Sequence, residues 1–347
     1  MLSIVKLAIK YILGLILFDN IDFMEKVSIV LLNWNGSSYI EKCVESVFNQ
    51  TYENIEFIIV DNGSTDSSLE LILKTYSNIT IIKNEFNLGF AQGMNLGISL
   101  SSGEYILLLN LDVYLRSDYV VNAVSLLRND GSLGCVGGVE YKWSKEGFID
   151  EHLPSSGPYY LKRRIQLFAD HKKLDESCYA FGVTGSFPVF RKSAIDDLIN
   201  ISGHFFDPLF QTGWEDTDVR FRLFWRGWKT LYSQDLVGWH VGSGSANSKI
   251  RLIDKPLDYQ KRIFRNRMYV IGKFPKELLD KLRIYLFLTN LLIFPYYVFI
   301  SPRSLFALFL SYKEFKEQKK EIYYRQQLIE SSINVKIDTI FEFFKKF

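Results

Sequence analysis

Histidine and cysteine are scarce in this chain of 347 residues, which restricts the sites that depend on them. There are four histidines and three cysteines, the latter at Cys43, Cys135 and Cys178. The cysteines lack the paired spacing of a zinc site. Their odd number argues against a disulfide framework and favours a reducing compartment. A His-rich or Cys-rich metal centre is therefore not expected.

Three nucleotide and hydrolase motifs are also missing. A dinucleotide-binding Rossmann fingerprint needs G-x-G-x-x-G after the first strand, but "NWNGSSY" (33–39) stands there. The sequence contains no P-loop, and it contains no G-x-S-x-G elbow of a serine hydrolase. Dinucleotide oxidoreductases, P-loop NTPases and α/β-hydrolases are thus poorly supported.

The chain as a whole has little net charge, but one segment is strongly basic. The net charge is only +2, so nucleic acid is not an expected partner. Residues 249–283, however, contain eleven Lys/Arg and four Asp/Glu, directly before an apolar stretch. A basic segment beside apolar sequence favours the anionic cytoplasmic leaflet of a membrane.

Both ends of the chain have membrane-like patterns. In residues 1–24, one narrow polar stripe runs along an otherwise apolar helix, which is typical of an interfacial helix. A signal anchor, or a chain that starts at Met24, is an alternative. Residues 282–300 are nearly long enough to span a bilayer, but Pro295 divides them. We expect a membrane-dipping hairpin there, with a single membrane span and a buried core helix as the alternatives. Residues 328–347 predict an amphipathic helix that binds a membrane or packs on the protein.

Apolar strands alternate with helical patterns through the first third of the chain. The predicted strands are 27–34, 55–64, 79–84 and 104–112, each followed by a helical pattern or a polar loop. This alternation predicts an α/β fold with a parallel sheet covered by helices on both faces. Polar residues gather where the strands end, and ligands bind at this edge of such sheets. They are Asn33, Asn35, Asp61, Asn62, Asn84, Asn87, Asn110 and Asp112.

Two later segments are rich in candidate polar residues. The segment "TGWEDTDVRFR" (212–222) has three acids within four residues, Glu215, Asp216 and Asp218. On a helix, Asp218 is expected to pair with Arg222 four residues on. At least one acid is explained by the helix dipole. His240 follows a short apolar strand, a position where a single histidine is usually structural.

In their order, these segments resemble family 2 glycosyltransferases with the GT-A fold, most closely the rhamnosyltransferase-like branch. The resemblance covers roughly residues 25–275, so we expect three parts: 1–24 as an N-terminal helix, 25–275 as the GT-A domain and 276–347 as a helical membrane-associating region. It implies a Rossmann-like mixed sheet. It is carried by the segments 27–68, 87–98, 103–113, 185–195, 205–229, 237–245 and 265–274.

The resemblance gives the strand ends a role in binding a nucleotide-diphospho-sugar donor. The family's D-x-D signature reads Asn110-Leu111-Asp112 here, so one carboxylate is replaced by an amide. Asp112 and His240 are then expected to hold Mn²⁺ or Mg²⁺. The remaining donor-binding residues implied by the resemblance are Asn33, Asn35, Asp61, Asn62, Gly63, Asn87, Gly89, Asn95, Asn110 and Leu111.

The resemblance also assigns the acceptor side. It implies that Asp216 is the general base, that Glu215 orients the acceptor or replaces the base, and that Trp214 stacks on a sugar. The expected reaction inverts the anomeric centre. The charged and apolar termini favour a polyprenyl-diphosphate-linked acceptor at the cytoplasmic face of the cell membrane, with Arg265 and Arg267 near its phosphates. Alternatives are a sugar nucleotidyltransferase and a non-catalytic binding protein with this fold.

Overall fold

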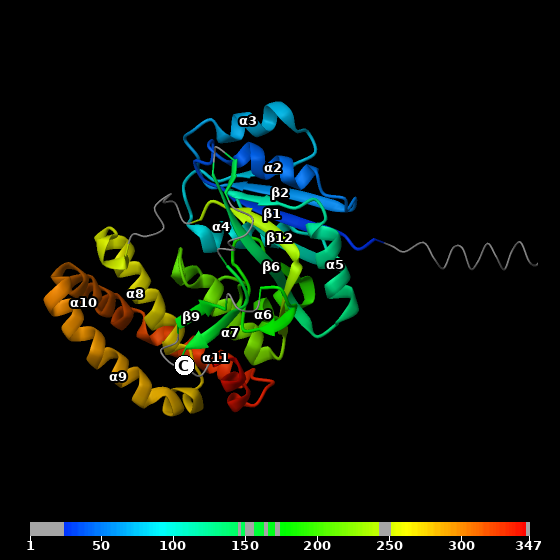
Figure 1. Ribbon diagram of the computed structural model, residues 1–347. Helices are drawn as coiled ribbons and strands as arrows, with labels where there is room; N and C mark the ends of the chain where they lie inside the picture. The colour runs from blue at the N-terminus through cyan, green and yellow to red at the C-terminus, as the bar shows by residue number, and fades with distance from the viewer. Residues whose placement is uncertain are drawn as a thin grey trace, which may run out of the picture.

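The computed structural model describes residues 24–144, 147–149, 156–162, 166–170, 174–242 and 251–344. The predicted N-terminal helix and residues 243–250 lie outside these ranges. The described chain forms a ten-stranded mixed sheet with helices on both faces, and a group of C-terminal helices lies beside it (Figure 1).

The first half of the sheet is parallel, as the alternation of strands and helices predicts. Its order is β4-β1-β2-β3. These strands are almost wholly apolar because helices cover both of their faces. Their bounds are β1 Val27–Asn33, β2 Ile55–Asp61, β3 Thr80–Lys83 and β4 Tyr105–Asn110.

Two apolar clusters fill the space between this sheet and its helices. One face packs against α2 (Ile40–Phe48), α3 (Ser68–Thr75) and α5 (Tyr119–Asn129). The other packs against α4 (Phe90–Leu100) and α6 (Lys192–Ser202).

Two glycines of α4 serve packing. A Cβ on Gly97 would lie 2.3 Å from a methyl group of Val30, and one on Gly93 would lie 2.5 Å from a methyl group of Leu32. The absence of a side chain at these positions lets the helix approach the sheet closely.

The second half of the sheet contains antiparallel strands. β11 (Val189–Arg191) lies between β4 and β6 and is antiparallel to both. β12 (Lys229–His240) is parallel to β6 and antiparallel to β5, which places His240 opposite Val113. The other strands of this sheet are β5 Val113–Leu115, β6 Leu133–Ser144, β7 Gly147–Ile149 and β10 Cys178–Ala180. β8 (Tyr159–Lys162) and β9 (Gln166–Ala169) pair antiparallel in a separate two-stranded sheet.

The C-terminal helices form a hairpin whose turn differs from the one we expected. α9 runs unbroken through Pro295, and the chain turns at Ser301, whose side chain caps α10. Figure 1 shows α8, α9 and α10 together on one side of the molecule.

Among the described helices, α9 is the one long and apolar enough to cross a membrane. The helices are α7 Glu215–Arg226, α8 Leu257–Gly272, α9 Lys276–Ile300, α10 Pro302–Glu317 and α11 Lys319–Ser331, with 3₁₀ turns at Pro208–Phe210, Leu252–Asp254 and Ile337–Phe343.

The prediction of one amphipathic helix over residues 328–347 is wrong. The structure has the end of α11 there, followed by a 3₁₀ turn. The apolar side chains of this segment, including Ile329, Ile337 and Ile340, are buried in a third cluster with Trp225 and Phe274. They pack on the protein, which was one of the two expected alternatives.

A buried ionic network also joins the C-terminal helices to the sheet domain. Asp207 accepts a hydrogen bond from Nζ of Lys273 at 2.8 Å, and it also pairs with Arg325. Asp218 pairs with Lys273 and, as predicted, with Arg222 at 2.8 Å. The domain boundary at residue 276 stays a prediction, but the packing is continuous across it.

Candidate active site

The ends of β1, β2 and β4 bring the predicted strand-end residues to one edge of the sheet. Asn33 is in register with Asp61, and Asn110 is in register with Leu32. Because these strands are parallel and adjacent, residues distant in the sequence become neighbours at their carboxyl ends. The structure therefore places Asn33, Asp61 and Asn110 at one edge of the sheet.

Asp61 is held in place by Asn33. The amide of Asn33 donates to Oδ1 of Asp61 at 2.8 Å and to the hydroxyl of Ser68 at 2.9 Å. Asn35 lies outside this buried pair, in a left-handed turn (φ 53°), where its side-chain oxygen accepts from the Thr65 backbone N–H. The pair is buried, whereas Asn35 is exposed.

Asn62 organises the loop that enters α4. Its amide donates to Oδ1 of Asn87 at 2.9 Å, and its oxygen accepts from the Leu88 N–H at 3.0 Å. Gly63 and Gly89 both have positive φ, 75° and 83°, which glycine adopts without strain. These contacts fix the loop 87–89 at the strand edge.

Asn95 lies apart from the polar residues at the strand ends. Its amide nitrogen donates to the carbonyl of Phe206 at 2.6 Å, and its oxygen accepts from the Phe206 N–H at 2.8 Å. Both ends of the amide are therefore engaged with the backbone of another segment. The structure gives Asn95 a positioning contact between α4 and residue 206.

A cavity of about 660 Å³ opens at this edge, and we call it the strand-end cavity. It brings together the loop at 87–89, the segment Asn110-Leu111-Asp112 and α8. Its lining comprises Leu32, Trp34, Asn62, Asn87, Leu88, Gly89, Phe90, Asn110, Leu111, Asp112, Gln211, Thr212 and Arg262.

Asp112 and His240 meet at the border of this cavity. Oδ1 of Asp112 lies 3.1 Å from Nε2 of His240. The backbone of Asp112 is fixed because its carbonyl accepts from the Trp143 indole N–H at 2.8 Å and from the Val241 N–H at 3.1 Å. β5 and β12 create this meeting, since they pair antiparallel at the point where both segments reach the edge.

The other ring nitrogen of His240, Nδ1, contacts two residues that were not predicted from the sequence. Nδ1 lies 3.0 Å from the hydroxyl of Ser186 and 3.3 Å from Oε2 of Glu140. The same carboxylate oxygen accepts from Thr184 at 2.6 Å. Burial opposes a charge on His240, but the hydrogen bonds to Asp112 and Glu140 prevail and raise its pKa to about 9.

This arrangement fits a metal-ligating histidine. A carboxylate on one ring nitrogen orients the other toward the metal, and Nε2 of His240 faces Asp112. Within the described residues, no group of three or more His, Cys, Asp and Glu side chains is arranged to hold an ion. Asp112 and His240 would thus supply two ligands, and the rest of the coordination shell would come from bound ligand and water.

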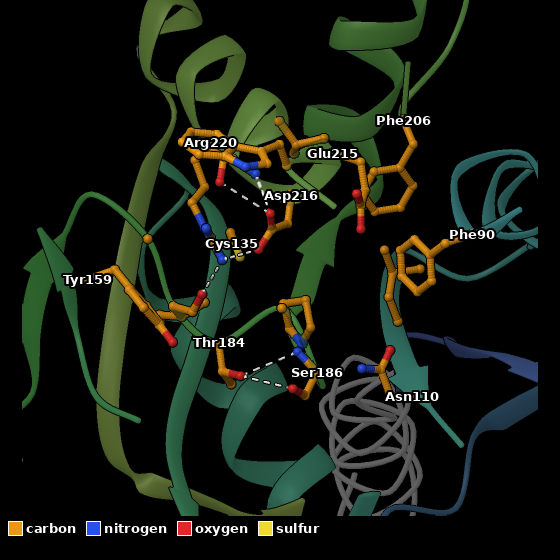
Figure 2. A pocket seen from close by; sticks show the side chains of 18 of the residues that line it. Phe90, Asn110, Cys135, Tyr159, Thr184, Ser186, Phe206, Glu215, Asp216 and Arg220 are labelled. Carbon is orange, nitrogen blue, oxygen red and sulfur yellow. Dashed lines mark hydrogen bonds and ion pairs between the residues drawn. The ribbon is translucent and has the colours of Figure 1, made fainter. Parts of the chain in front are cut away.

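A second cavity of about 580 Å³, the inner cavity, shares Asn110, Phe90 and Thr212 with the first. Figure 2 shows its lining, with Ser186 and Thr184 at one end and Glu215, Asp216 and Arg220 at the other. His240 lines it as well, so the two cavities meet beside the Asp112–His240 pair.

Glu215 and Asp216 open α7 and face this inner cavity in different surroundings. Oδ2 of Asp216 lies 2.8 Å from Nη2 of Arg220, and Figure 2 shows these side chains turned toward one another. Glu215 is buried, and its Oε2 has no hydrogen-bond partner among the described residues. Burial, followed by the charge of Asp216, raises the pKa of Glu215 to about 8. At neutral pH Glu215 is therefore a neutral carboxylic acid, next to the carboxyl group of Asp216 that pairs with Arg220.

Of the other residues predicted to bind the acceptor, Trp214 lines the inner cavity, whereas Arg265 does not. Trp214 has positive φ (73°) before α7 and lines the inner cavity. Arg265 lines neither cavity, and its guanidinium is engaged by Glu314 of α10 at 3.0 Å. Burial lowers the pKa of Arg267 on the same helix.

Sequence reasoning missed Glu140, Arg220 and Arg262. Glu140 gave a usable signal, because a carboxylate inside the apolar strand "CVGGVEYKW" (135–143) is as unexpected as Asp112 after its strand. Arg220 and Arg262 gave none, since each lies on a helix rich in charge and only the packing selects the side that faces a cavity.

Residues 28–199 match the family model described as Glycosyl transferase family 2. An uncharacterized glycosyltransferase of Haemophilus influenzae is 35% identical over 114 residues, which is 32% of this chain and 35% of that protein. The poly-beta-1,6-N-acetyl-D-glucosamine synthase of Staphylococcus aureus is 27% identical over 223 residues, 63% of this chain and 51% of that protein. The matches thus span about a third of the first curated relatives and half of the synthase.

Two solved structures have the same fold. GalNAc-T7 with UDP, GalNAc and Mn²⁺ aligns with a TM-score of 0.60 at 15% identity, over 87% of this chain and 58% of that one. A mannosyltransferase from Pyrobaculum calidifontis in complex with GDP-Man and Mn²⁺ aligns with a TM-score of 0.53 at 14% identity, over 90% and 86%. At these identities the likeness concerns the fold alone, and it confirms the expected GT-A architecture.

Proposed function

Because residues 28–199 of this chain belong to glycosyl transferase family 2, we propose that it is an inverting glycosyltransferase. It moves a sugar from a nucleotide-diphosphate donor to a hydroxyl of a glycan acceptor. The observation that carries this proposal is the meeting of two cavities beside one pair, Asp112 and His240, with the carboxyl pair Glu215 and Asp216 across the inner cavity. The rhamnosyltransferase-like branch stays a prediction.

The donor is assigned to the strand-end cavity. Asp61, Asn33 and Asn35 are not among the residues that line this cavity, and they are assigned to the nucleobase and ribose by the family resemblance and by their place at the same strand ends. The loop at Asn87 and Gly89 lines the cavity and is assigned to the diphosphate. Two proteins of the same fold were solved with a nucleotide or nucleotide sugar and Mn²⁺, which supports this class of donor and a divalent cation. Asp112 and His240 would hold that ion, Mn²⁺ or Mg²⁺, which neutralises charge on the leaving diphosphate when bound.

The protein's own groups then perform the proton transfer. Asp216, oriented by Arg220, takes the proton of the acceptor hydroxyl as the hydroxyl oxygen attacks the anomeric carbon. Glu215, neutral at pH 7 because of its burial, donates a hydrogen bond that orients the acceptor. Trp214 offers a face for a sugar ring. Attack from the side opposite the diphosphate inverts the anomeric centre in one displacement.

The acceptor is proposed to be a polyprenyl-diphosphate-linked glycan at the cytoplasmic face of the cell membrane. Support comes from the α9–α10 hairpin, which exposes large apolar side chains such as Phe287, Leu292, Phe299 and Phe309. The excess of positive charge in residues 249–283 lies directly before and within this hairpin. An apolar surface flanked by basic residues is suited to an anionic bilayer.

A donor panel tests the proposed activity. The purified chain is incubated with UDP-, GDP- and dTDP-sugars, with Mn²⁺ or Mg²⁺, and the products are read by mass spectrometry. Release of the nucleoside diphosphate, by hydrolysis or transfer, is the expected result. A sugar nucleotidyltransferase would instead make the sugar nucleotide from a sugar phosphate and a nucleoside triphosphate, and a non-catalytic protein would leave every donor intact.

A further inference from the structure

The strand-end cavity has an unusual balance of charge. Among its described lining residues, Asp112 is the one acid and Arg262 of α8 is the one Lys or Arg. Asn110 stands where a second carboxylate would be expected, so it adds no charge. A dianionic diphosphate entering this cavity meets a cationic side chain of the protein itself.

The guanidinium of Arg262 has unused hydrogen-bonding capacity. Its Nε is buried and, within the described chain, finds no hydrogen-bond acceptor. Its guanidinium carbon lies 5.6 Å from the ring centroid of Tyr259, and no carboxylate of the described residues lies within 4.0 Å. A buried donor without a partner is costly, and the cost is recovered when an acceptor arrives.

The position of Arg262 is fixed by its neighbours on α8, which are bound to α10. Ser304 donates to the side-chain oxygen of Gln260 at 2.6 Å, and Ser311 donates to the carbonyl of Lys261 at 2.8 Å. Nζ of Lys261 lies 2.8 Å from Glu314. α8 is therefore clamped just before and at the residue that precedes Arg262, so this arginine stands on a rigid support.

We propose that Arg262 binds the diphosphate of the nucleotide donor and stabilises the nucleoside diphosphate as it leaves. Arginine is suited to this task because its planar fork donates two parallel hydrogen bonds to phosphate oxygens. This assignment rests on the proposed function. With a single carboxylate at the metal position, Arg262 supplies positive charge that does not depend on an ion, so part of the diphosphate affinity persists without divalent cations.

Equilibrium binding of UDP, GDP and dTDP tests the assignment, with the matching nucleosides as probes that lack the diphosphate. Each is titrated by calorimetry with Mg²⁺ and with EDTA. Arg262→Gln should weaken the best-bound nucleoside diphosphate by roughly 10- to 100-fold and leave the nucleoside unchanged. Arg262→Lys should recover part of the loss. Lys255→Gln, which removes a positive charge that also lies over Tyr259 but outside the cavity lining, should bind like the wild type.

The outcomes separate this assignment from the proposed function. Equal diphosphate affinity in wild type and Arg262→Gln overturns the role of Arg262 and leaves the enzyme proposal standing. An equal loss of nucleoside and diphosphate affinity also overturns it, because that result indicates a structural effect. Absence of all nucleotide binding by the wild type refutes the proposed function and this assignment with it.

Discussion

Nε2 of His240 lies 3.1 Å from Oδ1 of Asp112, and the opposite ring nitrogen lies 3.3 Å from Oε2 of Glu140. The histidine is thus held between a carboxylate that faces the strand-end cavity and a buried one that orients the ring. Strand pairing between β5 and β12 creates this relationship, which turns an isolated histidine into part of a site.

Glu140 should therefore control metal affinity without touching the ion. Glu140→Gln is expected to raise the Mn²⁺ concentration needed for half-maximal donor turnover by about 10-fold or more, because the ring loses its orienting carboxylate. Saturating Mn²⁺ should restore most of the rate. Glu104→Gln, at an exposed position, is the control. An unchanged metal requirement would contradict this role.

The two carboxyl groups of α7 should respond differently to substitution. Asp216→Asn removes the base and is expected to lower turnover by about 100-fold or more at every pH. Glu215→Gln should keep most of the activity at pH 7, because the wild-type side chain is neutral there. If Asp216→Asn remains fully active, Asp216 is not the base.

The pH–rate profile gives a second test of Glu215. Its pKa is raised to about 8, so the protonated form that donates to the acceptor is lost as the pH rises past that value. Wild-type turnover should fall above pH 8, whereas Glu215→Gln should keep its rate because glutamine does not titrate. Identical alkaline limbs in the two proteins would argue against a neutral Glu215.

The raised pKa of Glu215 also predicts how the stability of the protein depends on pH. A carboxyl group whose pKa is higher in the folded than in the unfolded protein stabilises the folded state. This contribution is fully present below the unfolded-state pKa near 4.5, and it is lost as the pH rises toward 8. Glu215→Gln should therefore gain in free energy of unfolding, relative to wild type, between pH 5 and 8. Urea denaturation across this range measures the difference, and a constant difference would contradict the raised pKa.

The buried ionic network should be essential for folding. Asp207→Asn leaves Lys273 and Arg325 with one fewer anion in a dry environment, and we expect a loss of about 3–5 kcal/mol in the free energy of unfolding. Asp258→Asn, at an exposed ion pair with 3.8 Å separation, is the matched control and should change it by less than about 1 kcal/mol. Equal effects of the two would show that burial does not matter here.

The proposed binding of the α9–α10 hairpin to a membrane can be tested with point substitutions. Phe299→Ser with Phe309→Ser, at side chains 81% and 64% exposed, should abolish sedimentation with anionic liposomes. Leu73→Ser with Phe86→Ser, exposed on the sheet domain, should not. Deleting residues 282–347 is a poor alternative, because it would remove Arg325, Ile329 and Ile340 from the folded core.

The sequence predicted the parallel half of the sheet and the strand-end cluster well. Continuous apolar runs such as "VSIVLL" and "EYILLL" have few other interpretations, and parallel pairing brings Asn33, Asp61 and Asn110 to one edge. The Asp218–Arg222 pair was also predictable, since helix geometry fixes residues four apart.

The rest depended on tertiary packing, which local pattern does not determine. Pro295 is tolerated inside α9, and the apolar face after residue 328 packs into a core shared with Trp225. Arg265 and Arg262 lie three residues apart on α8, yet one contacts Glu314 and the other lines the strand-end cavity. Only the position of α10 decides which arginine is available.

Turnover of nucleotide sugars by wild type and Asp112→Asn tests the central claim most directly. With Mn²⁺ present, the wild type should release the nucleoside diphosphate from at least one UDP-, GDP- or dTDP-sugar. Asp112→Asn should lose at least about 100-fold of that rate, and Asp118→Asn, on a partly exposed surface ion pair, should match the wild type. Undiminished turnover by Asp112→Asn, or no turnover of any donor by the wild type, would contradict the account.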